Sequence, residues 1–159
     1  ELLIRQISGY DGVEPSGNSI AAMAFLKLSA YLIKPDLTQK AENIFLSFND
    51  ELMEYGLNST YMLQALHLYL GGLKEVAILG KKNDVSTQNL LKTVRKGFFP
   101  NSVIAFSYEE DIDINAKTIP LLRNRKLQNG KATAYVCRIG TCLPPVQTSE
   151  ELVKLLSYE

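Results

Sequence analysis

Two carboxylates, an amide and two serines gather in a short loop near the start of the chain. The loop reads DGVEPSGNS over residues 11–19 and directly precedes a long apolar segment. Glycine lets the backbone approach a ligand, proline fixes the loop, and two carboxylates can divide the roles of general acid and general base. Asp11 and Glu14 are therefore candidate catalytic residues. The same residues are also typical of a capped loop that enters a helix, and the sequence leaves both interpretations open.

Other polar and aromatic side chains could bind a ligand beside these carboxylates. Such groups orient the hydroxyls of a substrate. The candidate ligand-binding residues are Tyr10, Gly17, Asn18, Ser19 and Gln64. His67 is the sole histidine of the chain and a third candidate catalytic residue, because imidazole can carry a proton near neutral pH. A histidine on a helix face that is satisfied by a neighbour is the alternative.

Cys137 and Cys142 form a second candidate site, for redox chemistry. A disulfide between them requires Cα atoms within about 7 Å, which the spacing permits but does not guarantee. Two reduced thiols at the end of a strand are the interpretation that a reducing compartment favours. Two cysteines and one histidine cannot supply the four ligands of a structural zinc site, so we expect no metal and no cofactor.

The composition excludes several classes of partner. The chain has 159 residues, of which 46% are hydrophobic, and 17 basic side chains balance 17 acidic ones. This balance argues against nucleic acid or an anionic membrane as the partner. No apolar run is long enough to cross a bilayer, and the first residues show neither an initiator Met nor a signal pattern. We therefore expect a piece of a longer cytoplasmic protein.

The first half of the chain has helical periodicity. Apolar residues recur at helical spacing over residues 17–33, 36–55 and 58–70. The first and third segments are apolar nearly all round, whereas the second has a single apolar stripe. This alternation predicts inner, outer and inner helices of an α-hairpin array, within a first domain that covers residues 1–72.

The second half predicts a small α/β module over residues 73–159. Strands at 75–79 and 103–106 flank a helix at 85–96, which makes a βαβ unit with parallel strands. Residues 109–119 carry no clear pattern. Strands at 125–128 and 132–138 flank Asn129-Gly130, a strong hairpin signal, and a helix follows at 149–156. Gly80 before a helix could hold a phosphate, but the spaced glycines of a dinucleotide site are missing.

Three motifs resemble one known family. They are DGVEPSGNSIAA at residues 11–22, GK-x-x-AYVCR at residues 130–138, and a second cysteine shortly before Pro-Pro-Val. Together they resemble the C-terminal part of the YyaL-type, spermatogenesis-associated thioredoxin-domain proteins. Members of that family join an N-terminal thioredoxin-like domain to an (α/α)6 toroid similar to those of sugar epimerases and six-hairpin glycosidases. The resemblance implies an α+β chain that contains the last helices of a toroid, followed by the α/β module.

The resemblance also implies a function for the loop. Asp11 and Glu14 would line a carbohydrate-binding or sugar-epimerase-like pocket, with any isomerase activity confined to the full-length protein. The implied partners are the missing thioredoxin-like domain, the remaining toroid helices and a sugar ligand, and an unclosed ring would self-associate. Two alternatives stay open: a thiol-redox or chaperone-like accessory in which the cysteines exchange electrons with the thioredoxin-like domain, and a noncatalytic protein-interaction module.

Overall fold

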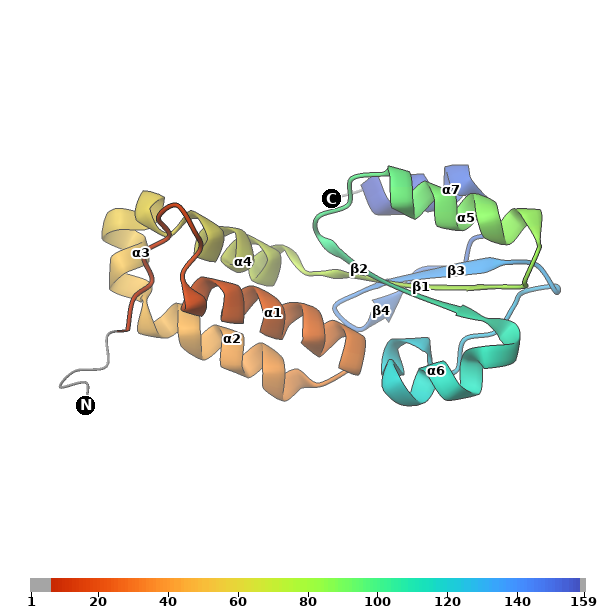
Figure 1. Ribbon diagram of the computed structural model, residues 1–159, viewed down its shortest axis with the longest axis horizontal. Coiled ribbons are helices and arrows are strands. Elements are labelled where there is room, and N and C mark those ends of the chain that lie inside the picture. Colours follow the sequence, from red (N-terminus) through yellow and green to blue (C-terminus); the bar gives the residue numbers. More distant parts are fainter. Residues whose placement is uncertain (1–6, 158–159) are drawn as a thin grey trace. The chain divides into compact units, whose positions relative to one another are not determined.

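The computed structural model describes residues 7–157 and is of mixed α and β structure, as expected (Figure 1). The chain divides into two compact units. The helical unit consists of the residues up to Ser29 together with Lys34–Gly71. The α/β unit consists of Ala30–Ile33 together with the residues from Gly72 onward.

Four α-helices contribute to the helical unit. They are α1 (Gly17–Leu32), α2 (Pro35–Ser47), α3 (Asn49–Tyr55) and α4 (Thr60–Gly71). A 3-10 turn over Gly56–Asn58 separates the last two. The buried apolar side chains of this unit recur at helical spacing, as the periodicity predicts. They are Ala22, Leu26, Ala41, Phe45, Met62, Ala65 and Leu68.

The prediction of a single helix over residues 36–55 is wrong, because the helix is interrupted at Phe48. This residue leaves helical geometry at φ −112° and ψ 15°. Its ring lies against the backbone of Gly9, where a Cβ atom would stand 2.7 Å from the ring. The helix restarts at Asn49 with two carboxylates in its first turn, which the N-terminal end of a helix dipole favours. Tertiary packing of one aromatic ring therefore overrides the continuous apolar stripe.

A four-stranded sheet in the order β2-β1-β3-β4 forms the centre of the α/β unit. The strands are β1 (Lys74–Gly80), β2 (Ser102–Tyr108), β3 (Thr133–Arg138) and β4 (Thr141–Cys142). Strand β1 pairs in parallel with β2, and α5 (Val85–Lys96) connects the two. Strand β3 pairs antiparallel with β1 and with β4. The expected βαβ unit is present.

The hairpin over residues 125–138 differs from the expectation. Asn129 and Gly130 do form a tight turn with φ of 53° and 68°, closed by a single bridge between Gln128 and Lys131. Residues 125–128 nevertheless form no strand, because β3 takes its ladder bonds from β1 and β4 instead. The unassigned stretch before it folds as a 3-10 turn (Glu109–Asp111), α6 (Ile112–Thr118) and a 3-10 turn (Pro120–Leu122).

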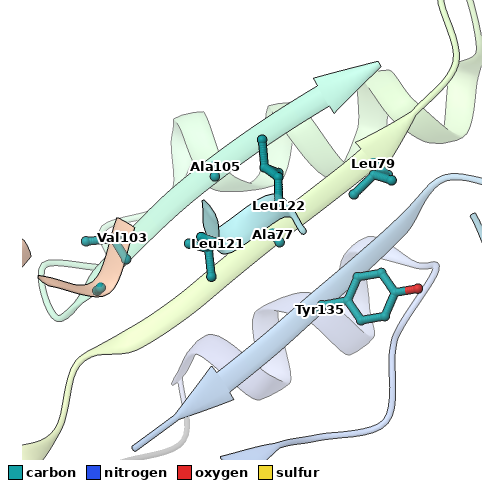
Figure 2. Close-up of a cluster of buried hydrophobic side chains, with 8 residues drawn as sticks. Ala77, Leu79, Val103, Ala105, Leu121, Leu122 and Tyr135 are labelled. Atoms are coloured by element: carbon teal, nitrogen blue, oxygen red, sulfur yellow. The ribbon is translucent and has the colours of Figure 1, made fainter. Parts of the chain in front are cut away.

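Each face of the sheet buries its own cluster of apolar side chains. On one face α6 and the 3-10 turn that follows it bring Leu121 and Leu122 against β1, β2 and β3 (Figure 2). On the other face α5 and α7 (Ser149–Ser157) pack Leu90 and Leu152 against the same strands. Helix α7 begins with a capping box in which the side chains of Thr148 and Glu151 each accept a hydrogen bond from the backbone N–H of the other. Strand β3 contributes side chains to both clusters, whereas both residues of β4 are exposed.

Candidate functional site

Asp11 joins the loop to the start of α4. Its Oδ2 accepts hydrogen bonds from the backbone N–H groups of Tyr61 at 2.8 Å and Met62 at 3.1 Å. Its Oδ1 accepts from the N–H of Ser16 at 2.7 Å. The first N–H groups of a helix lack partners within the helix, so a carboxylate there acts as a cap. Both oxygens of Asp11 are thus engaged in holding backbone.

These bonds also set the charge state of Asp11. Burial of the carboxyl by itself raises its pKa, but the hydrogen bonds from Ser16, Ser19, Met62 and Tyr61 outweigh this effect and lower the pKa below its ordinary value of 3.8. A carboxylate with a lowered pKa is a poor general acid and a poor general base near neutral pH. The geometry of Asp11 therefore fits the structural alternative, a cap that fixes the loop.

The rest of the loop divides into an anchored base and an exposed tip. Ser16 caps α1 by accepting the N–H of Ser19, and the hydroxyls of these two residues lie 2.8 Å apart. The side-chain amide of Asn18 donates to the carbonyl oxygen of Ser8 at 2.9 Å. Glu14 is exposed and makes no hydrogen bond or ion pair with any of residues 7–157. Tyr10 also lies in the exposed part of the loop.

The remaining candidates of the helical unit lie on its surface or make no side-chain contact. Gln64 and His67 are exposed and lie three residues apart on α4, one turn of the helix. Gly17 is the first residue of α1, and a Cβ atom there would meet no other atom within 4 Å. Asp11, Ser16 and Ser19 are therefore brought together, whereas no hydrogen bond joins Glu14 to His67 within the described part of the chain.

Cys137 and Cys142 form a disulfide, so the expectation of two reduced thiols is not met. The two residues face each other directly across β3 and β4, with Cα atoms 3.9 Å apart. A two-residue turn, Ile139-Gly140, joins the strands with φ of 49° and 74°. Positive φ is unfavourable for a β-branched residue such as Ile139. Cys137 is buried, whereas Cys142 is exposed at the end of the short strand β4.

An arginine lies beside both sulfur atoms. The Nη2 of Arg125 is 3.3 Å from Sγ of Cys137 and 3.7 Å from Sγ of Cys142. Its guanidinium carbon lies 4.9 Å from the centre of the Tyr135 ring, within the range of a cation–π contact. Its Nε is buried and has no acceptor among the described residues. The position of the guanidinium is thus fixed more by stacking than by hydrogen bonds.

A carboxylate completes this cluster. Glu75 of β1 is directly paired with Cys137 of β3, so the two side chains lie on the same face of the sheet. Burial raises the pKa of the Glu75 carboxyl, and the charge of Arg125 lowers it by a smaller amount. We name the four residues Glu75, Arg125, Cys137 and Cys142 the disulfide cluster. Sequence reasoning missed Glu75 and Arg125; the one signal available was a lone carboxylate at the start of an apolar strand.

A hollow of about 440 Å³ adjoins the disulfide cluster through Arg125, which is part of its wall. Apolar side chains form part of its wall, and the charged side chains there are mostly basic. Its charged residues are Asp113, Lys117, Arg123, Arg125 and Lys126. Four positive groups and one negative group thus line this hollow, which we name the basic hollow, in a chain whose overall charge is balanced.

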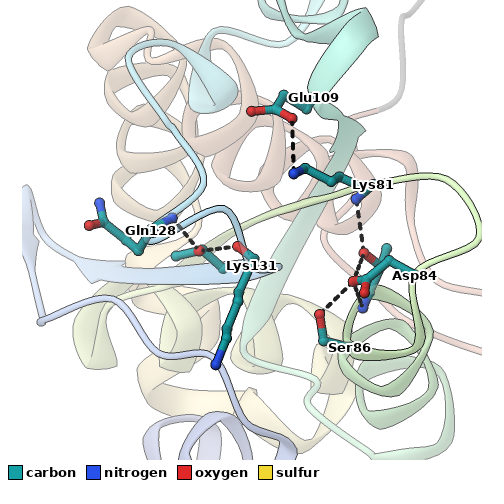
Figure 3. Close-up of polar contacts among 8 residues, drawn as sticks. Lys81, Asp84, Ser86, Glu109, Gln128 and Lys131 are labelled. Atoms are coloured by element: carbon teal, nitrogen blue, oxygen red, sulfur yellow. Dashed lines mark hydrogen bonds and ion pairs between the residues drawn. The ribbon is translucent and has the colours of Figure 1, made fainter.

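The start of α5 gives no support to the phosphate alternative at Gly80. The Asp84 carboxylate already accepts the N–H of Thr87 at 2.9 Å and so caps the helix (Figure 3). Lys81 in the same loop lies 4.0 Å from a carboxylate oxygen of Glu109. A negative side chain at the helix N-terminus would repel a phosphate from the position that the helix dipole favours.

Residues 7–157 contain neither a metal-binding cluster of side chains nor a helix that could span a membrane. In that part of the chain no three His, Cys, Asp or Glu side chains are grouped so that they could hold a metal ion. None of its helices is both long enough and apolar enough to cross a membrane.

Comparison with known proteins gives relatives by sequence alone. Spermatogenesis-associated protein 20 of Homo sapiens is 28% identical over 155 residues, and the rat protein of the same name is 27% identical over 156 residues. An uncharacterized protein of Caenorhabditis elegans is 25% identical over 158 residues. Each match covers 98% or 99% of this chain, but the chain spans only about a fifth of the relatives' length. The chain thus resembles a piece of a larger spermatogenesis-associated protein. No family profile and no solved structure matches.

Proposed function

We propose that the α/β unit carries a thiol–disulfide exchange site formed by the disulfide cluster. The observation that carries this proposal is the contact of one guanidinium group with both sulfurs of a bridge whose Cys142 end is exposed. Thiolates, not thiols, are the reactive species in exchange, and a neighbouring arginine stabilises them.

The reaction follows from which sulfur is accessible. A thiolate of a reducing dithiol attacks Sγ of Cys142, the S–S bond breaks, and its electron pair leaves with Sγ of Cys137 as a thiolate. Arg125 stabilises this leaving group, which lies closer to its Nη2 than Cys142 does. The second thiolate of the reductant then attacks the mixed disulfide and releases Cys142 as a thiolate. The dithiol is oxidised to a disulfide and the protein bridge is reduced.

Reduction by dithiothreitol tests the proposal. Free thiols are alkylated at intervals at pH 7 and counted by mass. Because exchange rates depend on the stability of the leaving thiolate, we expect Arg125→Gln to slow opening of the bridge about tenfold, and Arg125→Lys to keep part of the rate. Arg95→Gln removes an arginine from the last turn of α5 and is the matched control. Equal rates in all three variants, with unchanged circular dichroism, would leave the bridge as a structural link only.

A second candidate function, carbohydrate binding, rests on the anchored loop of the helical unit. In this proposal the unit is part of an (α/α)6 toroid in a longer protein with a thioredoxin-like domain, and the loop tip contributes Glu14 and Tyr10 to the pocket. The support is that Asp11 holds the loop while Glu14 stays unpaired among the described residues. Several large apolar side chains of the helical unit are exposed and favour cover by further helices or by self-association. They include Leu46, Met53, Leu57 and Leu70.

Saturation-transfer NMR on the longer protein with a panel of mono- and disaccharides tests this second candidate. Glu14→Gln should remove binding, because a carboxylate accepts hydrogen bonds from sugar hydroxyls more strongly than an amide does. Glu54→Gln alters an exposed carboxylate on α3 and should leave binding unchanged. Binding that survives Glu14→Gln, or absence of binding across the panel, would count against the pocket.

A further inference from the structure

We infer that the disulfide cluster exchanges preferentially with anionic thiols of peptide size, whose carboxylates bind the basic hollow. This inference rests on the proposed exchange function and names its substrate class. The hollow and the disulfide cluster share Arg125, so a thiol compound bound in the hollow would lie beside the bridge. The volume of about 440 Å³ lies within the range of small-molecule sites, roughly 300–1,000 Å³.

The charge pattern selects the class of thiol. Lys117, Arg123 and Lys126 belong to the wall of the hollow together with Arg125, and Asp113 is the one carboxylate there. Arg123 donates through Nε to the carbonyl oxygen of Ala116 at 3.2 Å, which fixes its side chain at the wall. Clustered positive charge raises the local concentration of anions and their rate of association. A thiol with free carboxylates would be enriched there, and a cationic thiol would be excluded.

The chemistry is the same exchange with a monothiol. The thiolate of the compound attacks Sγ of Cys142 and forms a mixed disulfide, and Cys137 leaves as a thiolate beside Arg125. A second molecule of the compound then attacks the sulfur of the first molecule in the mixed disulfide, and Cys142 leaves as a thiolate. Two thiolates are oxidised to one disulfide, and one protein disulfide is reduced to two thiolates.

Three thiols of different charge provide the test. Glutathione is anionic, 2-mercaptoethanol is neutral and cysteamine is cationic. Rate constants for opening of the bridge are measured for the 159-residue chain and corrected for the thiolate fraction of each compound. We expect glutathione to react at least about fivefold faster than 2-mercaptoethanol at 0.01 M ionic strength, and cysteamine to be slowest. The preference should fall at 1 M, where the screening length is only about 3 Å.

Two double variants locate the effect. Lys117→Gln with Lys126→Gln removes two charges from the hollow and should bring glutathione close to the rate of 2-mercaptoethanol, whose singly charged thiolate should slow much less. Lys92→Gln with Lys96→Gln removes two charges around a different hollow and is the matched control, which should keep the preference. Equal loss in both double variants would show an effect of net charge alone and overturn the assignment to the basic hollow.

The outcomes separate the two proposals. Rapid opening by all three thiols without a charge preference would overturn the substrate class while the exchange function stands. Failure of every thiol and of dithiothreitol to open the bridge in the folded chain would overturn the exchange function itself, and this inference with it.

Discussion

Removal of the Asp11 carboxylate distinguishes a structural role from a catalytic one. In Asp11→Ala the N–H groups of Tyr61, Met62 and Ser16 lose an acceptor that lies 2.7–3.1 Å away. Loss of an N-cap costs about 0.5–2 kcal/mol, and the third bond adds about 0.5–1.5 kcal/mol. We therefore expect the free energy of unfolding of the helical unit to fall by about 1–3 kcal/mol, since the two losses act on the same loop.

Amide hydrogen exchange measures this effect where it occurs. Each 1.4 kcal/mol corresponds to about a tenfold change in an opening equilibrium, so the amides of Ser16, Tyr61 and Met62 should exchange roughly 5- to 140-fold faster in Asp11→Ala. Glu14→Gln is the matched control, because Glu14 makes no hydrogen bond within the described residues. Unchanged protection of all three amides in Asp11→Ala would refute the capping role.

The same carboxylate predicts a pH dependence of defined sign. The folded-state pKa of Asp11 lies below its ordinary value of 3.8, because the hydrogen bonds outweigh the effect of burial. A group with a lowered folded-state pKa stabilises the fold fully above its unfolded value and loses this effect as the pH falls through the folded-state value. The difference in stability between the natural chain and Asp11→Asn should therefore be constant above about pH 5 and shrink as the pH falls through the ordinary value of 3.8 and below it. A difference that does not shrink at all as the pH falls below 3.8 would contradict the argument.

Three further perturbations test the α/β unit. Gly80→Ala places a Cβ atom 2.2 Å from Thr87, and the clash should lower the free energy of unfolding in urea by about 1–3 kcal/mol. Ile78→Ala empties a fully buried site in β1 and should cost about 2–5 kcal/mol, measured in the same way. The Ser86 hydroxyl and the Thr87 N–H and hydroxyl lower the pKa of Asp84 to about 2, so the stability lost in Asp84→Asn should be seen above pH 3.8 and vanish toward pH 2.

Matched substitutions control for each of these changes. Gly17→Ala introduces the same methyl group where it meets no atom within 4 Å, and Ile114→Ala truncates an exposed isoleucine. Both should leave the free energy of unfolding within about 0.5 kcal/mol of the natural chain. Asp113→Asn removes a carboxylate that caps no helix and should not reproduce the acid profile of Asp84→Asn. If the control variants lost as much free energy of unfolding as the test variants, the losses could not be attributed to the named contacts.

The local signals in the sequence predict most of the elements. Helical periodicity and the caps at Ser16 and Thr148 act within a few residues of each other, so the pattern of one segment suffices to place a helix. The apolar run at residues 76–79 of β1 likewise indicates a strand covered on both faces. The expectations that are wrong, a continuous helix through Phe48 and a strand over residues 125–128, fail because a partner distant in sequence decides the backbone there.

The roles of the candidate site residues also depend on partners that are distant in sequence. The sequence singles out Asp11 by its residue type, but its role depends on Tyr61 and Met62, which follow about fifty residues later. The two cysteines are recognisable from their spacing, whereas their bridge depends on the register of β3 against β4. A pattern of residue types can therefore indicate where chemistry is available, but it does not say which groups are already engaged in holding the fold.

The contrast between the two carboxylates Asp11 and Glu75 shows how the fold divides such roles. Both carboxylates are partly buried, and burial by itself raises the pKa of each. Hydrogen bonds, most of them from backbone N–H groups, reverse this effect at Asp11 and lower its pKa. At Glu75 the effect of burial is larger than that of the Arg125 charge, so its pKa is raised. A carboxylate whose lone pairs are occupied by backbone is committed to structure. One that is desolvated beside an arginine and a disulfide can gain or lose a proton when a neighbouring thiolate forms. This contrast supports the proposed exchange site around Cys137 over a catalytic role for Asp11.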